Sequence, residues 1–258
     1  MTAMPEAPAE PTKRRNRVEL FGVQVDALTL DDTIAAARAM IATGQPHQHV
    51  VLNAAKVVEM AHDPALRRVV QGCDLVNADG MAVVWAGRVL HAPLPERVAG
   101  IDLFERLVRA ARDDGYSVYF LGATDEVVER TVEAFTARYP GLRVAGSRNG
   151  YWDDDSAVIE QVRSASPDIL FLAIPSPRKE FWLNEHLHAL GVPFVMGVGG
   201  SFDVIAGKVS RAPQWMQRSG LEWAWRLVQE PRRMWRRYLF TNSAFIRMTW
   251  HEWWKGRR

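Results

Sequence analysis

The chain has 258 residues, 48% of them hydrophobic, so it can bury the core of one large domain or of one domain with an appendage. A single cysteine, Cys73, excludes a disulfide framework and indicates a reducing compartment. The net charge is only +2, and no apolar run approaches the ~18 residues of a transmembrane helix. Residues 1–17 turn from Pro- and Ala-rich to basic without an apolar core, which predicts a disordered tail rather than a signal peptide.

Short apolar strands alternate with amphipathic helices from Val18 onwards. Strands are predicted at Val18–Val25, His49–Leu52, Leu75–Val76, Ser117–Leu121, Leu142–Ala145, Asp168–Ala173 and Pro193–Val198. Helices are predicted from Asp31 or Asp32 to Ile41, through Val57–Met60, from Met81, and at Ile101–Asp114, Asp125–Tyr139, Ser156–Ser164 and Phe181–Leu190, with a loop at Gly146–Trp152. This order predicts an α/β domain over residues 18–209, with a Rossmann-like, mainly parallel sheet covered by helices on both faces.

The pattern changes at residue 210, and residues 210–258 predict a helical appendage. One helix is expected to end at Gln229, and Pro231 suits the first turn of the next. From Arg211 onwards, eleven Lys and Arg accompany three Asp and Glu, and seven of the ten Trp lie here. Such a surface suits a solvated helix face, an anionic membrane interface or nucleic acid. We expect the appendage to be mobile or detached in the absence of membrane or substrate. Its removal should leave a soluble domain but abolish membrane recruitment and most activity.

Asp79 follows the apolar pair Leu75–Val76 and precedes Gly80. Ligands of open α/β sheets collect at the carboxyl ends of strands, where a carboxylate can act as a general base. The same residue could instead be the N-cap of the helix that begins near Met81. From these residues alone, both interpretations remain open.

Two further motifs have a structural alternative. The turn Gly197–Asp203 contains Gly199 and Gly200, whose backbone could approach a phosphate, but a tight strand–helix turn needs glycine anyway. Asp153–Asp155 fits the loose DxD pattern of metal-dependent glycosyl transfer, yet three acids before a helix more often form a solvated N-cap. We expect no metal site and no cofactor. The absence of GxGxxG with a downstream acid argues against a dehydrogenase.

Several blocks, taken together and in order, resemble one family. They are Leu52-Asn53, Asn77–Gly80, Glu96–Leu103, Ser176–Glu180, Gly197–Asp203 with Ala206-Gly207, Arg211–Pro213, Gly220–Trp223 and Glu230–Arg233. From about Val18 to about Phe245 the chain resembles the WecG/TagA/CpsF glycosyltransferases. The resemblance implies a bacterial enzyme that transfers a sugar from a nucleotide donor to an undecaprenyl-diphosphate-linked acceptor, with inversion and without a metal.

The resemblance also implies roles for individual residues. Asp79 matches the proposed catalytic base and Asn53 an active-site polar residue, which could contact donor or acceptor. The remaining matches are substrate-binding residues: Arg97 near the donor diphosphate, Tyr151 and Asp203 near the nucleotide, and Arg226, Arg233 and Arg236 from the appendage. There are two departures. Val51 replaces the Thr of some relatives, which removes any hydroxyl contact there, and Lys179 replaces the Gln of many, which leaves a cation at this substrate-binding position.

The leading hypothesis is therefore a UDP-sugar-dependent hexosyltransferase, bound peripherally to the cytoplasmic face of the inner membrane. Its expected partners are the UDP-sugar donor, the lipid-linked saccharide acceptor and an anionic membrane surface. A homo-oligomer is plausible, and the sequence does not decide the number of copies. Nucleic acid is not an expected partner. The alternative is a nucleotide- or nucleic-acid-binding module that uses the basic Trp/Arg tail, which would give Asp79 no task.

Overall fold

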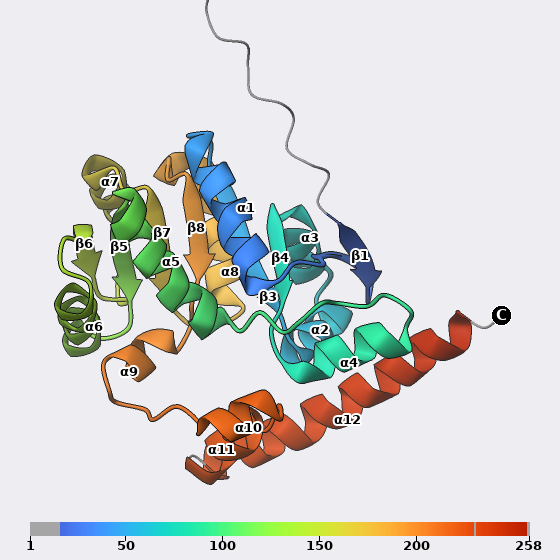
Figure 1. Ribbon diagram of the computed structural model, residues 1–258. Coiled ribbons are helices and arrows are strands. Elements are labelled where there is room, and N and C mark those ends of the chain that lie inside the picture. The colour runs from blue at the N-terminus through green and yellow to red at the C-terminus, as the bar shows by residue number, and fades with distance from the viewer. Residues whose placement is uncertain (1–15, 230, 257–258) are drawn as a thin grey trace, which may run out of the picture.

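The computed structural model describes residues 16–229 and 231–256 and contains a six-stranded sheet at its centre (Figure 1). The strand order is β4-β3-β8-β7-β5-β6, and every neighbouring pair is parallel. The bounds are β3 (His47–Leu52), β4 (Leu75–Ala78), β5 (Ser117–Gly122), β6 (Arg143–Arg148), β7 (Ile169–Ala173) and β8 (Phe194–Gly197). The predicted α/β fold class is confirmed, although β6 occupies part of the expected Gly146–Trp152 loop.

The prediction of a single strand at Val18–Val25 is wrong, because this segment forms a two-stranded hairpin outside the main sheet. Strand β1 (Arg17–Leu20) pairs antiparallel with β2 (Val23–Asp26). Phe21 and Gly22 connect them, both with positive φ (54° and 74°), as a two-residue hairpin turn with the matching twist requires. Arg17 belongs to β1 and pairs with Asp26 at 2.9 Å, so the predicted tail is shorter than proposed; its residues 1–15 lie outside the described residues.

Helices cover both faces of the sheet (Figure 1). They are α1 (Leu30–Ala42), α2 (Ala54–His62), α3 (Pro64–Gly72), α4 (Met81–Val89), α5 (Gly100–Asp114), α6 (Asp125–Arg138), α7 (Asp155–Ala165), α8 (Arg178–Leu190) and α9 (Ser201–Ile205). Helix α1 begins one residue before the predicted aspartates, because Thr29 forms the N-cap and a capping box with Asp32.

The core follows from alternation along the strands. Val118 and Phe120 of β5 belong to the cluster beneath α1, α5 and α6, whereas Tyr119 and Leu121 belong to the cluster beneath α7 and α8. Phe104 of α5 lies at the centre of the first cluster, with its ring 4.6 Å from that of Phe171 between ring centroids. Strands buried on both faces are continuous in their hydrophobicity, which is why the sequence predicted them well.

The appendage consists of α10 (Gln214–Arg218), α11 (Glu222–Gln229) and α12 (Pro231–Lys255), and it is docked on the α/β domain. Figure 1 shows these helices on the side of the sheet where strand β8 ends. Helix α12 runs past α2 and α4. Phe245 of α12 is 5% exposed and packs against Phe21, with the ring centroids 5.3 Å apart. The appendage is docked rather than detached in this structure, since an apolar stripe on α12 completes the core cluster of the hairpin, α2 and α4. The expectation that it is mobile stays a prediction.

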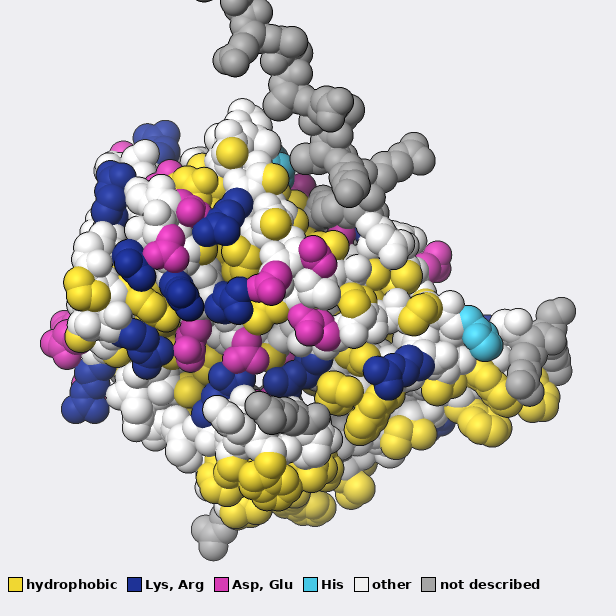
Figure 2. All heavy atoms as spheres, viewed as in Figure 1, with side chains coloured by type: hydrophobic (Ala, Val, Ile, Leu, Met, Phe, Trp, Pro, Cys, Tyr) yellow, Lys and Arg dark blue, Asp and Glu magenta, His cyan; other side chains and the backbone are white. Residues whose placement is uncertain are grey.

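The opposite side of the appendage exposes large apolar side chains. Figure 2 shows hydrophobic groups gathered along the appendage. Those more than half exposed on it are Trp215, Val228, Leu239, Phe240, Ile246, Trp250 and Trp254. Within the described residues, no helix is both long and apolar enough to span a bilayer. A helix that is buried on one side and apolar on the other presents a contiguous patch of the kind that marks interaction surfaces.

A buried histidine links β3, β4 and α1. His49 donates from Nε2 to Oδ1 of Asn77 at 3.1 Å, because an amide oxygen only accepts, and Asn77 donates to Thr33 at 3.0 Å. Burial lowers the pKa of His49 from 6.5 to about 3, and nearby Lys56 acts in the same direction.

This pKa shift predicts a pH-dependent stability. Between pH 6.5 and pH 3 the unfolded chain binds a proton at His49 that the folded chain does not, so stability is lost as the pH falls through this window. The contribution approaches about 1.4 kcal/mol per pH unit. Urea unfolding of His49→Gln between pH 4.5 and 7.5 should show a correspondingly smaller slope of unfolding free energy against pH; a slope equal to that of the wild type would contradict this assignment.

Candidate functional site

Asp79 lies between the carboxyl end of β4 and the N-terminus of α5. Its backbone N–H donates to the carbonyl of Leu52 at 2.8 Å, which continues the β3–β4 pairing by one residue. Its Oδ2 lies 3.7 Å from the position that a Cβ on Gly100 would take. The N-cap of α4 is Gly80, with no side-chain capping hydrogen bond. Asp79 is therefore not the N-cap of α4, and its role as the catalytic base stays a prediction.

Asn53 follows β3 and is therefore beside Asp79. Its Oδ1 accepts from the backbone N–H of Lys56 at 2.9 Å and so caps α2. The predicted polar residue thus has a structural task, and it points its carboxamide into the first turn of α2. Asn53 and Asp79 follow the ends of β3 and β4, and they lie side by side because parallel neighbours end on the same side of the sheet.

Arg97 precedes α5 and joins the α/β domain to the appendage. Val98 donates to the carbonyl of Ala78 at 2.9 Å, which holds this loop alongside Asp79. The Arg97 side chain is 12% exposed and pairs through Nη1 with Glu222 of α11 and through Nη2 with Asp102 of α5 at 3.8 Å. In this structure two carboxylates therefore already neutralise the cation that was predicted near the donor diphosphate.

A second arginine completes this network. Arg211 pairs with Asp102 at 2.6 Å and lies 3.6 Å from Glu222. Burial alone would lower the pKa of Arg211, but the hydrogen bond and charge of Asp102 raise it above its usual value. Arg211 and Glu222 belong to the sequence blocks that resemble the family, but no sequence pattern predicted that they form an ion-pair network with Arg97.

Lys179 belongs to a buried cluster at the ends of β3, β7 and β8. Its stem crosses Gly197, where an added Cβ would lie 2.9 Å from Lys179 Cδ, and its Nζ is 2.6 Å from Oε1 of Glu180. Lys56 also binds Glu180, and Ser176 donates to Glu180 at 2.9 Å. Burial lowers the pKa of Lys179, Lys56 adds to this, and Glu180 opposes it. Two lysines thus share one carboxylate.

Gly199, Gly200 and Asp203 form the turn after β8. Gly199 has φ +53°, so the turn requires a residue that tolerates the left-handed region, and Gly200 is the N-cap of α9. Asp203 accepts at its carbonyl from the N–H groups of Lys208 and Val209, and its carboxylate lies 3.9 Å from Lys208 Nζ. These contacts support the structural interpretation of the turn and leave its nucleotide-binding role a prediction.

The other predicted residues lie apart from Asp79 or outside the described side chains. Tyr151 is 73% exposed and follows β6, at the opposite edge of the sheet from β4. The backbones of Arg226, Arg233 and Arg236 belong to α11 and α12, but their side chains lie outside the described part of the structure. Their predicted closure over the site therefore stays a prediction.

The Asp153–Asp155 motif is used for local structure. Asp154 caps α7 by accepting from Ser156 at 2.9 Å, and Asp155 accepts from the indoles of Trp152 and Trp182, both at 2.6 Å. Among the residues that the structure describes, no three His, Cys, Asp or Glu side chains are grouped as metal ligands. The capping interpretation of this motif is the one that the contacts support.

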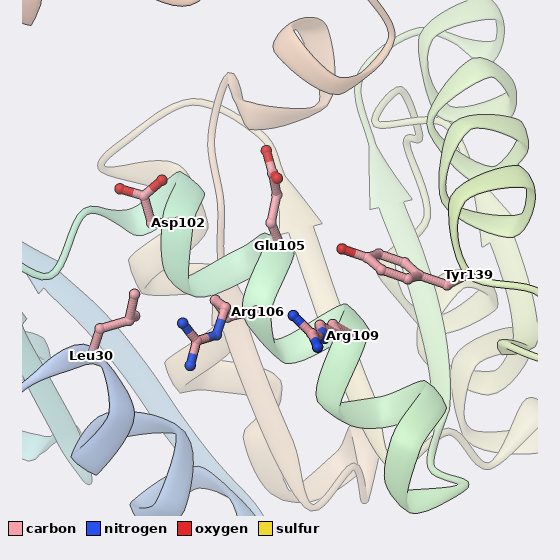
Figure 3. A pocket seen from close by; sticks show the side chains of 6 residues that line it. All are labelled: Leu30, Asp102, Glu105, Arg106, Arg109 and Tyr139. Atoms are coloured by element: carbon pink, nitrogen blue, oxygen red, sulfur yellow. The ribbon is translucent and has the colours of Figure 1, made fainter. Parts of the chain in front are cut away.

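Two cavities flank the N-terminal half of α5. The smaller, about 260 Å³, runs along the outer surface of α5 between Leu30 and Tyr139, and Figure 3 shows that its charged lining comes from α5. None of the predicted site residues lines it. The larger, about 520 Å³, lies where α4 and α5 meet the appendage, and Arg97 is part of its wall.

A family model described as glycosyl transferase WecG/TagA/CpsF family matches residues 18–258. The chain belongs to this family. The relatives include proteins named N-acetylglucosaminyldiphosphoundecaprenol N-acetyl-beta-D-mannosaminyltransferase from Bacillus spizizenii strain W23, 36% identical over 75% of both chains, and from Bacillus subtilis strain 168, 35% identical over 66% of both. A third, from Staphylococcus aureus strain MW2, is 31% identical over 84% of this chain and 87% of the relative.

Family membership confirms the resemblance and the expectation of a glycosyltransferase. The reported relatives are all named as transferases that act on a lipid-linked saccharide, which favours the enzyme hypothesis over the nucleic-acid-binding alternative. The roles of individual residues, the donor and the number of subunits stay predictions.

Proposed function

We propose that this protein is an inverting, metal-independent glycosyltransferase. It moves a sugar such as N-acetylmannosamine or glucose from a UDP-sugar to an undecaprenyl-diphosphate-linked saccharide during synthesis of a bacterial surface polysaccharide. The observation that carries the proposal is the position of Asp79, a carboxylate at the carboxyl ends of the parallel strands, between β4 and the first residue of α5. Family membership supports the reaction class.

The chemistry follows from single displacement. The Asp79 carboxylate takes the proton of the acceptor hydroxyl while that oxygen attacks the anomeric carbon of the donor, and the bond from that carbon to the diphosphate breaks. Attack opposite the leaving group inverts the anomeric configuration. The departing UDP carries negative charge that needs cationic partners, for which Arg97, Lys179 and the appendage arginines are candidates.

The test is donor turnover. Purified protein is mixed with a synthetic lipid-diphosphate-sugar acceptor, a panel of UDP-sugars and EDTA, and UDP release is followed. One donor should release UDP only when acceptor is present, and the product should carry the inverted linkage by NMR. Release that requires added Mg²⁺ or Mn²⁺ would contradict metal independence, and silence across the panel would contradict the donor class.

The exposed apolar face of α12 supports peripheral contact with a membrane, which we propose to be the cytoplasmic side of the inner membrane. Replacing Leu239 and Phe240 together by Glu should lower affinity for anionic liposomes by tenfold or more, because each removes apolar area from the interface and adds like charge. Cosedimentation measures the effect. The control, Ala137→Glu with Ser164→Glu, adds the same charge to exposed positions of α6 and α7 and should bind normally; equal binding by both double variants would exclude α12 as the membrane contact.

A further inference from the structure

Gly100 is the first residue of α5, at the point where this helix meets Asp79. We infer that Gly100 is a specificity-determining residue of the transfer reaction. Its missing side chain keeps a space the size of a methyl group open beside Oδ2 of Asp79, and the acceptor hydroxyl enters that space to lose its proton. The inference rests on the proposed function, in which Asp79 is the base, and adds the residue that admits the acceptor to it.

The space is defined by what a Cβ on Gly100 would touch. Such an atom would lie 3.6 Å from Cγ1 of Val51, 3.7 Å from Oδ2 of Asp79 and 3.9 Å from Cγ2 of Val51, which are its nearest neighbours among the described residues. All three distances are ordinary van der Waals contacts. A methyl group would therefore fit here without displacing any of these atoms.

Neither the backbone nor the packing requires a glycine at this position. Gly100 is not one of the glycines with a positive φ, so an alanine could adopt its conformation. Glycine is also a poorer helix former than alanine. A residue that weakens its helix, and that the surrounding structure does not require, indicates a functional reason, because departures from local preference are expected at functional sites.

The walls of the space suit a secondary alcohol. A base must come within about 2.6–3.2 Å of the oxygen whose proton it takes, so the acceptor oxygen has to lie in the first layer of atoms around the carboxylate. The two methyl groups of Val51 offer no hydrogen bond, and Oδ2 of Asp79 is the polar atom among the three neighbours. A sugar carbon that carries a hydroxyl matches both, with its O–H directed at Asp79 and its C–H against Val51.

Contacts of the preceding loop hold Gly100 in place. Val98 donates to the carbonyl of Ala78 at 2.9 Å, which fixes the loop alongside β4. Glu96 accepts from the backbone N–H of Leu30 at 2.5 Å, which ties the same loop to the N-terminus of α1. Helix α5 itself is anchored by its buried face. A larger residue at position 100 would therefore fill the space rather than move the helix.

The experiment compares Gly100→Ala with the wild-type protein in the transfer assay. The added methyl group should lower kcat/KM for the lipid-linked acceptor by roughly tenfold to 100-fold, because the attacking oxygen can no longer take its place beside the base. Calorimetry should find the Kd of UDP changed by less than about twofold, and the Tm should equal or exceed that of the wild type.

Gly72→Ala is the matched control. It makes the same change at a glycine of α3 whose Cβ would meet nothing within 4 Å, and it should alter neither activity nor binding.

Three results would overturn the inference while the proposed function stands, because the wild-type protein transfers sugar in each of them. Gly100→Ala could keep the wild-type kcat/KM for the acceptor, its Kd for UDP could weaken, which would assign the space to the donor, or its Tm could fall clearly, which would assign Gly100 to packing. A wild-type protein that transfers no sugar to the acceptor would overturn the function and the inference together.

Discussion

Asp79→Asn is expected to fold as the wild type does and to lose roughly 10²–10⁴-fold in kcat. The carboxamide keeps the shape of the side chain beside Gly100 but accepts no proton from the acceptor hydroxyl. The Kd of UDP should stay within about twofold, because the change removes a group that acts on the acceptor. Turnover at saturating substrates and calorimetric binding of UDP measure the two quantities.

Asp154→Asn is the matched control. Asp154 is exposed and caps α7, and Asn caps a helix about as well as Asp, so activity and thermal stability should remain normal. Near-normal turnover by Asp79→Asn would remove Asp79 from the role of base. If Asp79→Asn unfolds at the assay temperature, the lost activity would instead reflect a structural role of Asp79.

Glu180→Gln is expected to destabilise the protein by about 3–5 kcal/mol, because it leaves Lys56 and Lys179 buried without their counterion. Burial opposes the charge of Glu180, yet the two ammonium groups outweigh it and lower its pKa. The carboxylate is thus ionised in the folded protein. For a chain of this size the loss corresponds to a Tm lower by about 6–20 °C, which calorimetry detects.

A double variant tests the cause. Lys56→Met with Glu180→Gln removes one buried cation together with the carboxylate and should recover part of the lost stability, since paired removal of buried charges costs little. If the double variant is as unstable as Glu180→Gln alone, the stability resides in the hydrogen bonds of Glu180, such as that from Ser176, rather than in charge.

The sequence predicts this fold well where burial determines it. Strands such as β5 and β7 are apolar on both faces, and the intervening helices show their own period. The hairpin was missed because Val18–Val25 was interpreted as one strand, without a turn at Phe21-Gly22. Helix α3 was missed although Asp63 before Pro64 is an N-cap followed by a proline at N1.

The site is predictable only in part. Asp79 and Asn53 follow neighbouring parallel strands, so their proximity follows from topology. The partners of Arg97 and Lys56 do not, since Glu222 and Glu180 lie more than 120 residues away in the chain and no local pattern links them. Whether a cation is available to a substrate depends on such partners, and the sequence shows only that the cation is there.

Helix α12 has a consequence for deletion experiments. Its inner side, through Phe245, closes a hydrophobic cluster that also contains Phe21, while its outer side exposes the apolar patch. Cutting the chain at residue 210 would therefore strip a wall from the core as well as a surface from the outside, and the fragment would expose new apolar area of its own. If that fragment aggregates or binds vesicles, the cause would be the apolar area that the truncation exposes. Point substitutions on the outer side of α12 therefore test membrane binding more directly than truncation does.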